Sequence, residues 1–250
     1  MRVDVHLTPG QVDELQLRNK NVVVIDVLRA GTTIASALSN GAKEVIPVET
    51  VEAAVKISGS LFGEVVLLGG ERGGKIIEGF HLGNSPSEYV SKVVKGKSIV
   101  YTTTNGSLAM TKGRYAKRLA IAAFVNAGRV VNYIKKVAED FTFICAGNQM
   151  AVGGFSLEDA VCAGMIIHRV EKEGSKDIKL SDSAACALTL YRSFGKNILK
   201  MMENSEQGKY HIELGMKSDM KFCASVDSIP ILPLLRGNVL RLEQDVSPKD

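Results

Sequence analysis

The segment that decides the fold is NVVVIDVLRAGTTIASALS, residues Asn21–Ser39. It begins with Val22–Ile25, a run of β-branched residues without a polar break, which is typical of a strand buried on both faces in a parallel sheet. Asp26 stands where this strand should end, and a helical pattern follows until Asn40-Gly41 stops it. We therefore expect a strand, a turn and a helix, the repeating unit of α/β proteins.

The turn after this strand carries several groups that can bind an anion or a metal. Asp26 and Arg29 are followed by the hydroxyls of Thr32 and Thr33. Ligands of open α/β sheets bind at the carboxyl ends of the strands, and a helix N-terminus offers free N–H groups to an anion. The turn is therefore a candidate oxyanion or metal–phosphate site. The alternative is an ordinary capped turn with a surface arginine.

The composition restricts the class of protein and its partners. The 250 residues are 45% hydrophobic and 23% charged, which allows one α/β domain over 1–250 or two intimately packed lobes of about 1–115 and 116–250. The net charge is +4 without a basic tract, and Trp is absent, which argues against nucleic acid as a partner. A small anionic substrate suits this mild positive charge.

The chain shows no signal of a membrane or of an exported protein. Its first residues lack the apolar core of a signal peptide, and no segment reaches the ~18 apolar residues of a membrane span. The four cysteines form no C-x-x-C pair, which argues against a zinc site. We expect a cytoplasmic protein, and a homodimer because most such enzymes are symmetric oligomers.

The pattern of a strand followed by a polar turn recurs along the chain. The strands Glu64–Leu68, Lys97–Tyr101 and Phe141–Ala146 lead into the turns Gly69–Lys75, Thr102–Ser107 and Gly147–Phe155. We predict an α/β fold with a mostly parallel, mixed sheet layered with helices and a ligand site at the carboxyl ends of the strands. If the strands are parallel, these turns share one edge of the sheet.

The turn Gly69–Lys75 almost matches a phosphate-binding P-loop. Ile76 stands where that motif requires Ser or Thr, and no helical pattern follows, so the P-loop is rejected. What remains is a flexible glycine loop that carries Glu71 and Arg72 close to a ligand. The alternative is a solvated turn with a surface salt bridge.

Neutral hydrogen-bonding groups gather in two of the loops. Thr102, Thr103, Thr104 and Asn105 form the turn after one strand, and Asn84 precedes a helix start. Hydroxyl and amide groups can bind a phosphate or sulfonate without charge, so we predict that these residues bind the substrate. A helix-capping cluster is the alternative.

Four carboxylates are candidate ligands of a divalent cation: Asp26, Glu71, Glu158 and Asp159. Glu158 and Asp159 stand in the first turn of a helix predicted after Ser156. Acidic residues there complement the helix dipole, which is the structural alternative for both. Carboxylate oxygens suit Mg²⁺, which would neutralise a phosphate and orient a water for in-line attack.

The predicted catalytic residues are Asp26, Arg29, Glu71 and Arg72, with the two arginines holding substrate oxygens. Three isolated histidines, His6, His168 and His211, are interpreted as structural rather than catalytic.

The chain resembles the 2-phosphosulfolactate phosphatase family in its sequence motifs. Four motifs carry the resemblance, which covers most of the chain and weakens after about Ser175: VIDVLRAGTTIASALSNGA (Val24–Ala42), LLGGERGGKIIEGFHLGNSPSEY (Leu67–Tyr89), IVYTTTNGS (Ile99–Ser107) and ICAGNQMAVGGFSLEDAVCAG (Ile144–Gly164). One departure is Ala122-Ala123-Phe124, where the family has Gly-Ser-Phe.

This resemblance implies a magnesium-dependent hydrolase. Such an enzyme converts 2-phospho-3-sulfolactate to 3-sulfolactate and phosphate, a step toward coenzyme M. A metal-activated water is the expected nucleophile, since the chain lacks the D-x-D and C-x5-R patterns of phosphatases that form phosphoenzymes.

Two alternatives remain. One is a non-catalytic α/β module that binds an anionic metabolite or nucleotide, although several carboxylates near a phosphate repel it unless a cation intervenes. The other is a different magnesium-dependent phosphotransfer enzyme.

Overall fold

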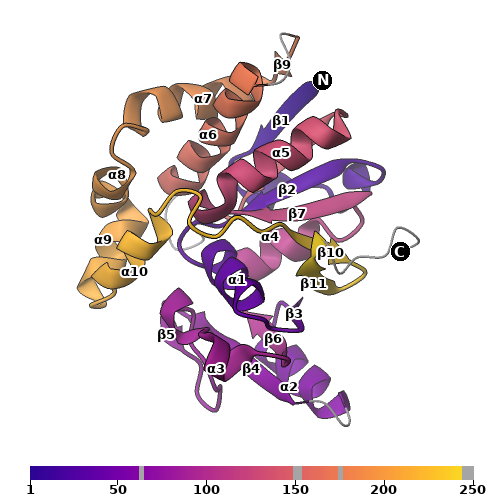
Figure 1. Ribbon diagram of the computed structural model, residues 1–250, viewed down its shortest axis with the longest axis vertical. Helices are drawn as coiled ribbons and strands as arrows, with labels where there is room; N and C mark the ends of the chain where they lie inside the picture. Colours follow the sequence, from indigo (N-terminus) through magenta and orange to yellow (C-terminus); the bar gives the residue numbers. More distant parts are fainter. Residues whose placement is uncertain (62–64, 149–153, 174–176, 244–250) are drawn as a thin grey trace.

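The computed structural model describes residues 1–61, 65–148, 154–173 and 177–243. In this part of the chain eleven strands form one sheet, in the order β5-β4-β6-β3-β11-β10-β7-β2-β8-β1-β9. Helices lie on both faces of the sheet (Figure 1). The predicted α/β class with a mostly parallel, mixed sheet is confirmed. The predicted loop Gly147–Phe155 includes residues 149–153, which lie outside the described residues.

The first parallel group of strands is built around the segment that decides the fold. β2 pairs in parallel with β7 and β8, and β1 lies between β8 and β9. The strands of this group are β1 (Arg2–His6), β2 (Asn21–Ile25), β7 (Arg118–Ala122), β8 (Phe141–Cys145) and β9 (Lys179–Leu180).

β2 is buried along its whole length because its side chains alternate between two cores. Val23 and Ile25 pack into the core formed with α5 (Ala127–Val137) and α6 (Leu157–Glu173). Val22 and Val24 pack on the opposite face, with α1 (Ala30–Ser39) and α4 (Gly106–Lys112). The β-branched run therefore fills both layers, as the sequence predicts.

The second parallel group pairs β6 with β3 on one side and β4 on the other. α2 (Val51–Ser60) covers it, and α3 (Ser91–Val94) precedes β6. Its strands are β3 (Glu44–Pro47), β4 (Val66–Arg72) and β6 (Ser98–Thr102), and β5 (Lys75–Ile76) forms a hairpin with β4.

The glycine-rich turn Gly69–Lys75 differs from its prediction. β4 continues through Gly69, Gly70 and Glu71 to Arg72, so most of the expected flexible loop is strand, and only Gly73-Gly74 makes the turn into β5. Gly70 has φ +141°, and a Cβ there would lie 1.9 Å from the carbonyl oxygen of Thr102. This glycine is required because the neighbouring strand approaches so closely, rather than for flexibility.

A C-terminal hairpin joins the two groups. β10 (Pro233–Arg236) and β11 (Val239–Leu242) pair with each other, with β7 and with β3, each time antiparallel. Three successive antiparallel pairings make β3 run opposite to β7, so the strand-end turns do not share one edge of a single parallel sheet. The strand order also interleaves the two predicted lobes, because β1 and β2 lie beside β7 and β8.

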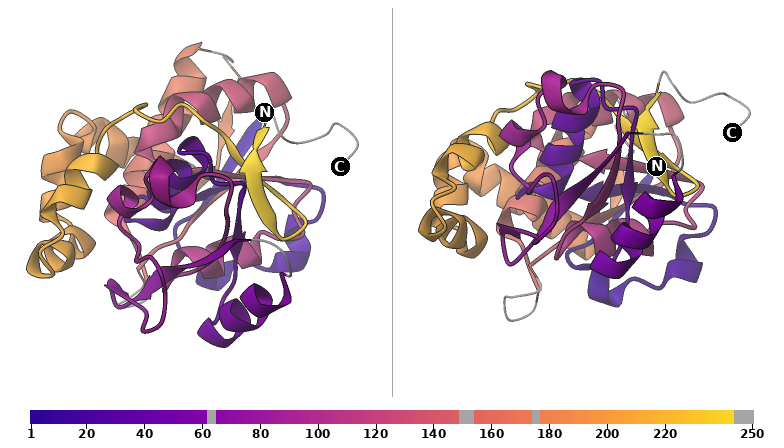
Figure 2. Two further views of the ribbon diagram at one scale, coloured as in Figure 1. Left: turned by 60° about the horizontal axis from the view of Figure 1, so that its bottom comes forward. Right: turned by 90° about the horizontal axis from the view of Figure 1, so that it is seen from below.

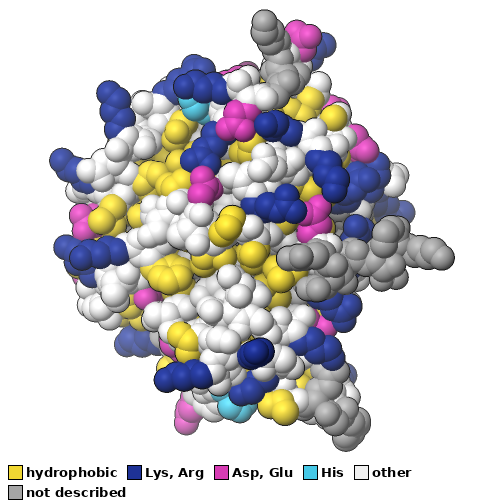
Figure 3. All heavy atoms as spheres, viewed as in Figure 1, with side chains coloured by type: hydrophobic (Ala, Val, Ile, Leu, Met, Phe, Trp, Pro, Cys, Tyr) yellow, Lys and Arg dark blue, Asp and Glu magenta, His cyan; other side chains and the backbone are white. Residues whose placement is uncertain are grey.

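The C-terminal helices stand to one side of the sheet before the chain returns as the hairpin (Figures 1 and 2). They are α7 (Asp182–Phe194), α8 (Ile198–Asn204), α9 (Glu206–Glu213) and α10 (Lys217–Cys223). Among the described residues, no helix has both the length and the apolar character needed to cross a membrane. Lys and Arg side chains are scattered among acidic ones on the face shown in Figure 3.

Candidate functional site

The N-termini of two helices from different parts of the chain meet at Asp26. Asp26 follows β2, is 4% exposed, and its Oδ1 accepts a hydrogen bond from the Ala30 N–H at 3.0 Å. Gly106, the first residue of α4, lies against the same carboxylate: a Cβ there would be 2.5 Å from Asp26 Oδ2. The turn after β2 and the turn after β6 are therefore in direct contact, although their sheet groups run in opposite directions.

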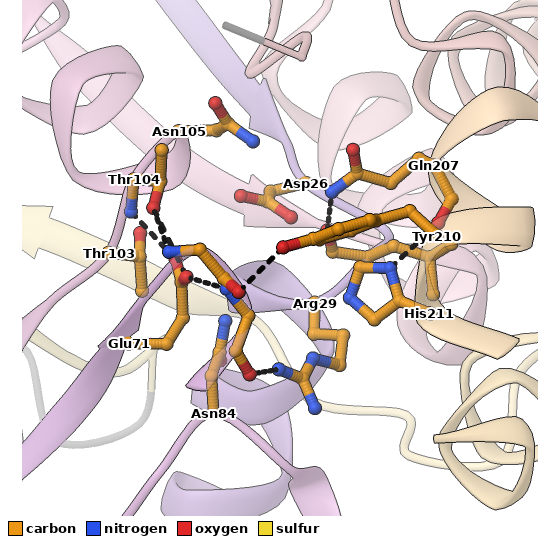
Figure 4. Close-up of a pocket in the computed structure, with 13 residues that line it drawn as sticks. Asp26, Arg29, Glu71, Asn84, Thr103, Thr104, Asn105, Gln207, Tyr210 and His211 are labelled. Carbon is orange, nitrogen blue, oxygen red and sulfur yellow. Dashed lines mark hydrogen bonds between the residues drawn. The ribbon is translucent and has the colours of Figure 1, made fainter. Parts of the chain in front are cut away.

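One cavity opens at this contact (Figure 4). It brings together side chains from the turns after β2, β4 and β6, from the loop before Ser85 and from α9. Its lining comprises Asp26, Leu28, Arg29, Glu71, Gly73, Gly74, Asn84, Thr103, Thr104, Asn105, Gln207, Tyr210 and His211. Of the residues predicted from the sequence, Asp26, Arg29, Glu71, Asn84, Thr103, Thr104 and Asn105 belong to this lining.

Asp26 carries a negative charge that the protein compensates only partly. Burial, together with the neighbouring charges of Glu71 and Glu158, raises its pKa to about 7, although the Ala30 N–H and Arg29 act in the opposite direction. In the described residues its Oδ2 accepts no hydrogen bond, and Figure 4 shows the carboxylate facing the cavity. A bound cation would relieve this excess of negative charge.

Glu71 holds two walls of the cavity together. Its Oε1 accepts from the Thr104 N–H at 2.7 Å, and its Oε2 accepts from the Gly74 N–H at 2.7 Å and from Thr104 Oγ1 at 3.1 Å. The β4–β5 turn is thereby tied to the turn after β6. Because three donors already occupy this buried carboxylate, its geometry suits positioning of the walls.

Arg29 lines the cavity, and its guanidinium group is fixed by contacts with other parts of the chain. Its Nη1 forms a salt bridge with Asp219 Oδ2 at 2.7 Å, and its Nη2 donates to the Gly74 carbonyl at 3.0 Å. Ser85 Oγ donates to the other oxygen of Asp219 at 2.7 Å. The Arg29 Nε is buried without a partner in the described residues. Asp219 lies on α10, a helix that the sequence patterns did not indicate.

Asn84 presents a donor to the cavity. The Tyr101 hydroxyl donates to its Oδ1, which fixes the orientation of the amide. Figure 4 shows the amide nitrogen pointing into the cavity, between Glu71 and Arg29. A neutral donor at this position suits an oxygen of an anionic ligand.

Arg72 and Thr102 point away from the cavity, so the structure does not place them where the sequence predicted. Successive side chains of a strand face opposite sides, and Glu71 and Thr103 take the cavity side. Arg72 instead donates to Thr102 Oγ1 at 2.9 Å and to the Glu49 carbonyl at 2.9 Å. These residues brace the ends of β4 and β6.

Thr32 and Thr33 are also outside the lining. Both are fully buried in the first turn of α1. Thr32 Oγ1 donates to the Val27 carbonyl at 3.0 Å, and Thr33 Oγ1 donates to the Asn84 carbonyl at 2.9 Å. Their hydroxyls hold the neighbouring loops, because the helix N-terminus is turned so that Asp26 and Arg29 face the cavity instead.

The predicted set of four metal ligands is not assembled at one point. Glu158 and Asp159 are buried at the start of α6 and do not line the cavity. Asp159 accepts from the Val27 N–H at 2.8 Å and from the Gly147 N–H at 3.1 Å, so it holds the turn behind Asp26. In the described ranges no group of three or more His, Cys, Asp or Glu side chains is arranged to hold a metal ion.

Glu158 differs from Asp159 because one of its carboxylate oxygens accepts no hydrogen bond from the described residues. Its Oε2 is buried without a hydrogen-bond partner in the described residues, and burial raises the pKa of the carboxyl. It lies close enough to Asp26 to raise the pKa of that residue. It therefore adds negative potential behind the cavity.

Three polar side chains of the lining were not predicted as site residues from the sequence, and all three come from α9. Gln207, Tyr210 and His211 have the spacing i, i+3 and i+4, which places them on one face of a helix. The Tyr210 hydroxyl donates to the Gly73 carbonyl at 2.9 Å and closes the cavity wall. This spacing was the signal available in the sequence, but no pattern showed that this face of the helix turns toward Asp26.

Comparison with known proteins identifies relatives over nearly the whole chain. Residues 6–238 match the model of the family described as 2-phosphosulpholactate phosphatase. A protein of Caldanaerobacter subterraneus subsp. tengcongensis is 39% identical over 245 residues, 98% of this chain and 100% of its own. One of Clostridium novyi is 40% identical, covering 93% of this chain and 96% of its own. Both are named "Probable 2-phosphosulfolactate phosphatase".

Proposed function

The chain belongs to the 2-phosphosulfolactate phosphatase family, and we propose that it hydrolyses 2-phospho-3-sulfolactate to 3-sulfolactate and phosphate. The observation that carries the proposal is the convergence on one cavity of a buried carboxylate, Asp26, a buried guanidinium, Arg29, and neutral polar side chains from two loops. A phosphate monoester that also bears a sulfonate and a carboxylate needs such a mixture of charged and neutral contacts.

The lining residues have separable tasks in this reaction. Arg29, held by Asp219 and Gly74, offers a fixed positive charge to the anionic substrate. The Asn84 amide donates to a substrate oxygen, and Glu71 keeps Thr104 and Gly74 in place around it. Rigid walls of this kind orient the phosphoryl group for in-line displacement.

A magnesium ion belongs to the proposal, with Asp26 as the side chain that would hold it. Mg²⁺ is commonly bound by one or two carboxylates together with substrate phosphate oxygens and waters, so a single cavity-facing carboxylate is a sufficient protein contribution. The uncompensated charge around Asp26 and the unpartnered Glu158 Oε2 behind it support a cation there. When bound, the ion would neutralise phosphate charge and lower the pKa of a coordinated water.

The test is phosphate release from a panel of phosphate monoesters that includes 2-phospho-3-sulfolactate. We expect turnover in magnesium, loss of turnover in EDTA, and recovery when magnesium is restored. Alkyl monoesters without the sulfonate should react with a lower kcat/KM. Binding of the monoester without turnover in either condition would instead support the non-catalytic binding module.

Three further expectations stay predictions. They are a cytoplasmic location, a homodimer, and a role on the route to coenzyme M.

A further inference from the structure

His211 is oriented by a hydrogen bond that determines where its proton lies. Its side chain is 3% exposed, and its Nδ1 lies 2.8 Å from the carbonyl oxygen of Gln207, one turn earlier in α9. A carbonyl oxygen can only accept a hydrogen bond, so Nδ1 must carry the proton. In the neutral ring the lone pair is then on Nε2.

The free nitrogen of this ring faces the cavity. Figure 4 shows one ring nitrogen of His211 bonded to Gln207 and the other turned toward the space beside Arg29. Nε2 has no hydrogen-bond partner among the described residues. The orientation thus provides a proton acceptor at the place where the substrate is expected.

The surroundings favour the neutral ring. Three charged groups act on it from the elements packed around it: Arg29 at the start of α1, Glu71 on β4 and Asp219 on α10. Burial lowers the pKa of His211 most, Arg29 lowers it further, and the hydrogen bond to Gln207 and the two carboxylates oppose this only in part. At neutral pH the ring is therefore uncharged and able to accept a proton.

We propose that His211 is the general base of the reaction, taking a proton from the water that attacks phosphorus. This inference rests on the proposed function. The O–H bond of the water breaks and its proton passes to Nε2, while its oxygen forms the new bond to phosphorus. The bond between phosphorus and the sulfolactate oxygen breaks with its electron pair, and the alkoxide takes a proton from solvent. The imidazolium then releases its proton to solvent.

The other titratable groups of the described lining are less suited to this step. The Tyr210 hydroxyl already donates to Gly73, and the Glu71 carboxylate already accepts from three donors. Asp26 is the proposed contact of the cation. His211 combines a fixed tautomer, a free acceptor atom and a position on the cavity surface.

The test compares His211→Asn with His168→Asn as a matched control. Asn at 211 can still donate to the Gln207 carbonyl, which preserves the helix contact, but it has no nitrogen that titrates. His168 lies on α6 and not in the cavity lining. We expect kcat of His211→Asn to fall by ~10²–10⁴-fold with KM changed by less than about threefold. The control should match the wild type.

Two further measurements separate a general base from a general acid or a structural residue. The acidic limb of the kcat/KM pH profile should disappear in His211→Asn, because the base must be unprotonated to act. The loss of kcat should be equally large for an aryl phosphate, whose good leaving group needs no acid. A defect confined to alkyl phosphates would make His211 a general acid and overturn the proposal.

A nitrogen-15 NMR spectrum of the wild-type protein tests the tautomer without any variant. We expect the proton on Nδ1 and the lone pair on Nε2 at neutral pH. A proton on Nε2, or near-normal kcat in a folded His211→Asn, would show that His211 is not the base while leaving the phosphatase activity established. Absence of phosphate release from the wild type with every monoester would instead reject the proposed function and this assignment with it.

Discussion

Arg29 Nη1 and Asp219 Oδ2 lie 2.7 Å apart, with both side chains almost completely buried. They are 190 positions apart in the sequence, so this salt bridge ties α10 to the first residues after β2. It also helps to fix the Arg29 guanidinium in the cavity wall, since the second terminal nitrogen, Nη2, donates to the Gly74 carbonyl. The C-terminal helices are thus part of the candidate site.

Replacing Asp219 by Ala should destabilise the protein strongly. The change leaves a buried guanidinium without its partner, and breaking a buried pair in this way costs about 3–5 kcal/mol. Urea unfolding measures the loss. Ser85→Ala is the matched control, because it removes the hydrogen bonds of Ser85 Oγ to Asp219 and Ser87 but leaves the ion pair in place, and it should cost about 1–2 kcal/mol. Equal effects of the two variants would contradict a structural role for the ion pair.

Glu71→Gln should loosen the cavity walls. The amide has one acceptor oxygen, and its NH₂ group would face a backbone N–H, so about 1–3 kcal/mol of stability should be lost and kcat/KM should fall. The matched control is Glu78→Gln, an exposed position after β5, which should change neither quantity. Retention of wild-type kcat/KM by Glu71→Gln would show that this carboxylate does not position the site.

Arg72→Ala should separate stability from activity. Arg72 braces Thr102 and the Glu49 carbonyl on the side away from the cavity, so its loss should lower the unfolding free energy by about 1–3 kcal/mol. At a temperature where the variant is folded, kcat should fall far less than in Asp26→Asn. A selective loss of kcat with normal stability would restore the catalytic role expected from the sequence.

Gly106→Ala should damage the contact between the two helix starts. Its Cβ would lie 2.5 Å from Asp26 Oδ2 and 2.6 Å from the Ala30 Cβ, distances that force the carboxylate or the helix to move. We expect loss of both activity and stability. Gly59→Ala in α2 meets nothing within 4 Å and should stabilise the protein by about 0.5–1 kcal/mol without changing kcat. Normal activity in Gly106→Ala would mean that this contact is not needed.

Asp26→Asn should remove a pH dependence of the unfolding free energy. The pKa of Asp26 is raised to about 7 in the folded protein from 3.8, so its stabilising contribution is complete below pH 3.8 and is lost as pH rises through 7. In EDTA, the wild type should lose stability relative to Asp26→Asn between pH 5 and 8 by more than about 1 kcal/mol. If the difference in unfolding free energy between the wild type and Asp26→Asn were the same at pH 5 and pH 8, the raised pKa would be contradicted.

The same variant should lose most of its phosphatase activity. Asn cannot supply the anionic oxygen that the proposed Mg²⁺ needs, and losing several kcal/mol of charge stabilisation lowers kcat by more than about 100-fold. Magnesium titrations of phosphate release measure this. Near-normal turnover in Asp26→Asn would remove this residue from the centre of the site.

The local patterns of the sequence were sufficient for several of the parallel strands and for part of the site. The run Val22–Ile25 predicts a strand buried on both faces because every residue is apolar, and β2 is such a strand. Residues directly after strands, such as Asp26 and Thr103, are predicted near a ligand because strand ends are where ligands bind in α/β folds. Both line the cavity.

Tertiary structure decided which of these polar groups face the cavity. Glu71 and Arg72 are neighbours in the sequence with the same expected role, yet the pleat of β4 sends them to opposite sides. Which side faces the cavity depends on pairing between strands distant in sequence, and local composition does not encode that pairing. The same holds for Asp159, whose carboxylate binds two backbone N–H groups instead of a ligand.

The sequence by itself determined several buried strands, most of the polar turns after them and the resemblance to a family. Only the tertiary structure brought the second sheet group and α9 against Asp26. The physical reason is that side-chain periodicity depends on neighbours two to four positions away. The contacts of Arg29 with Asp219 and of Gly106 with Asp26 depend instead on how the antiparallel hairpin and the C-terminal helices pack against the rest of the chain.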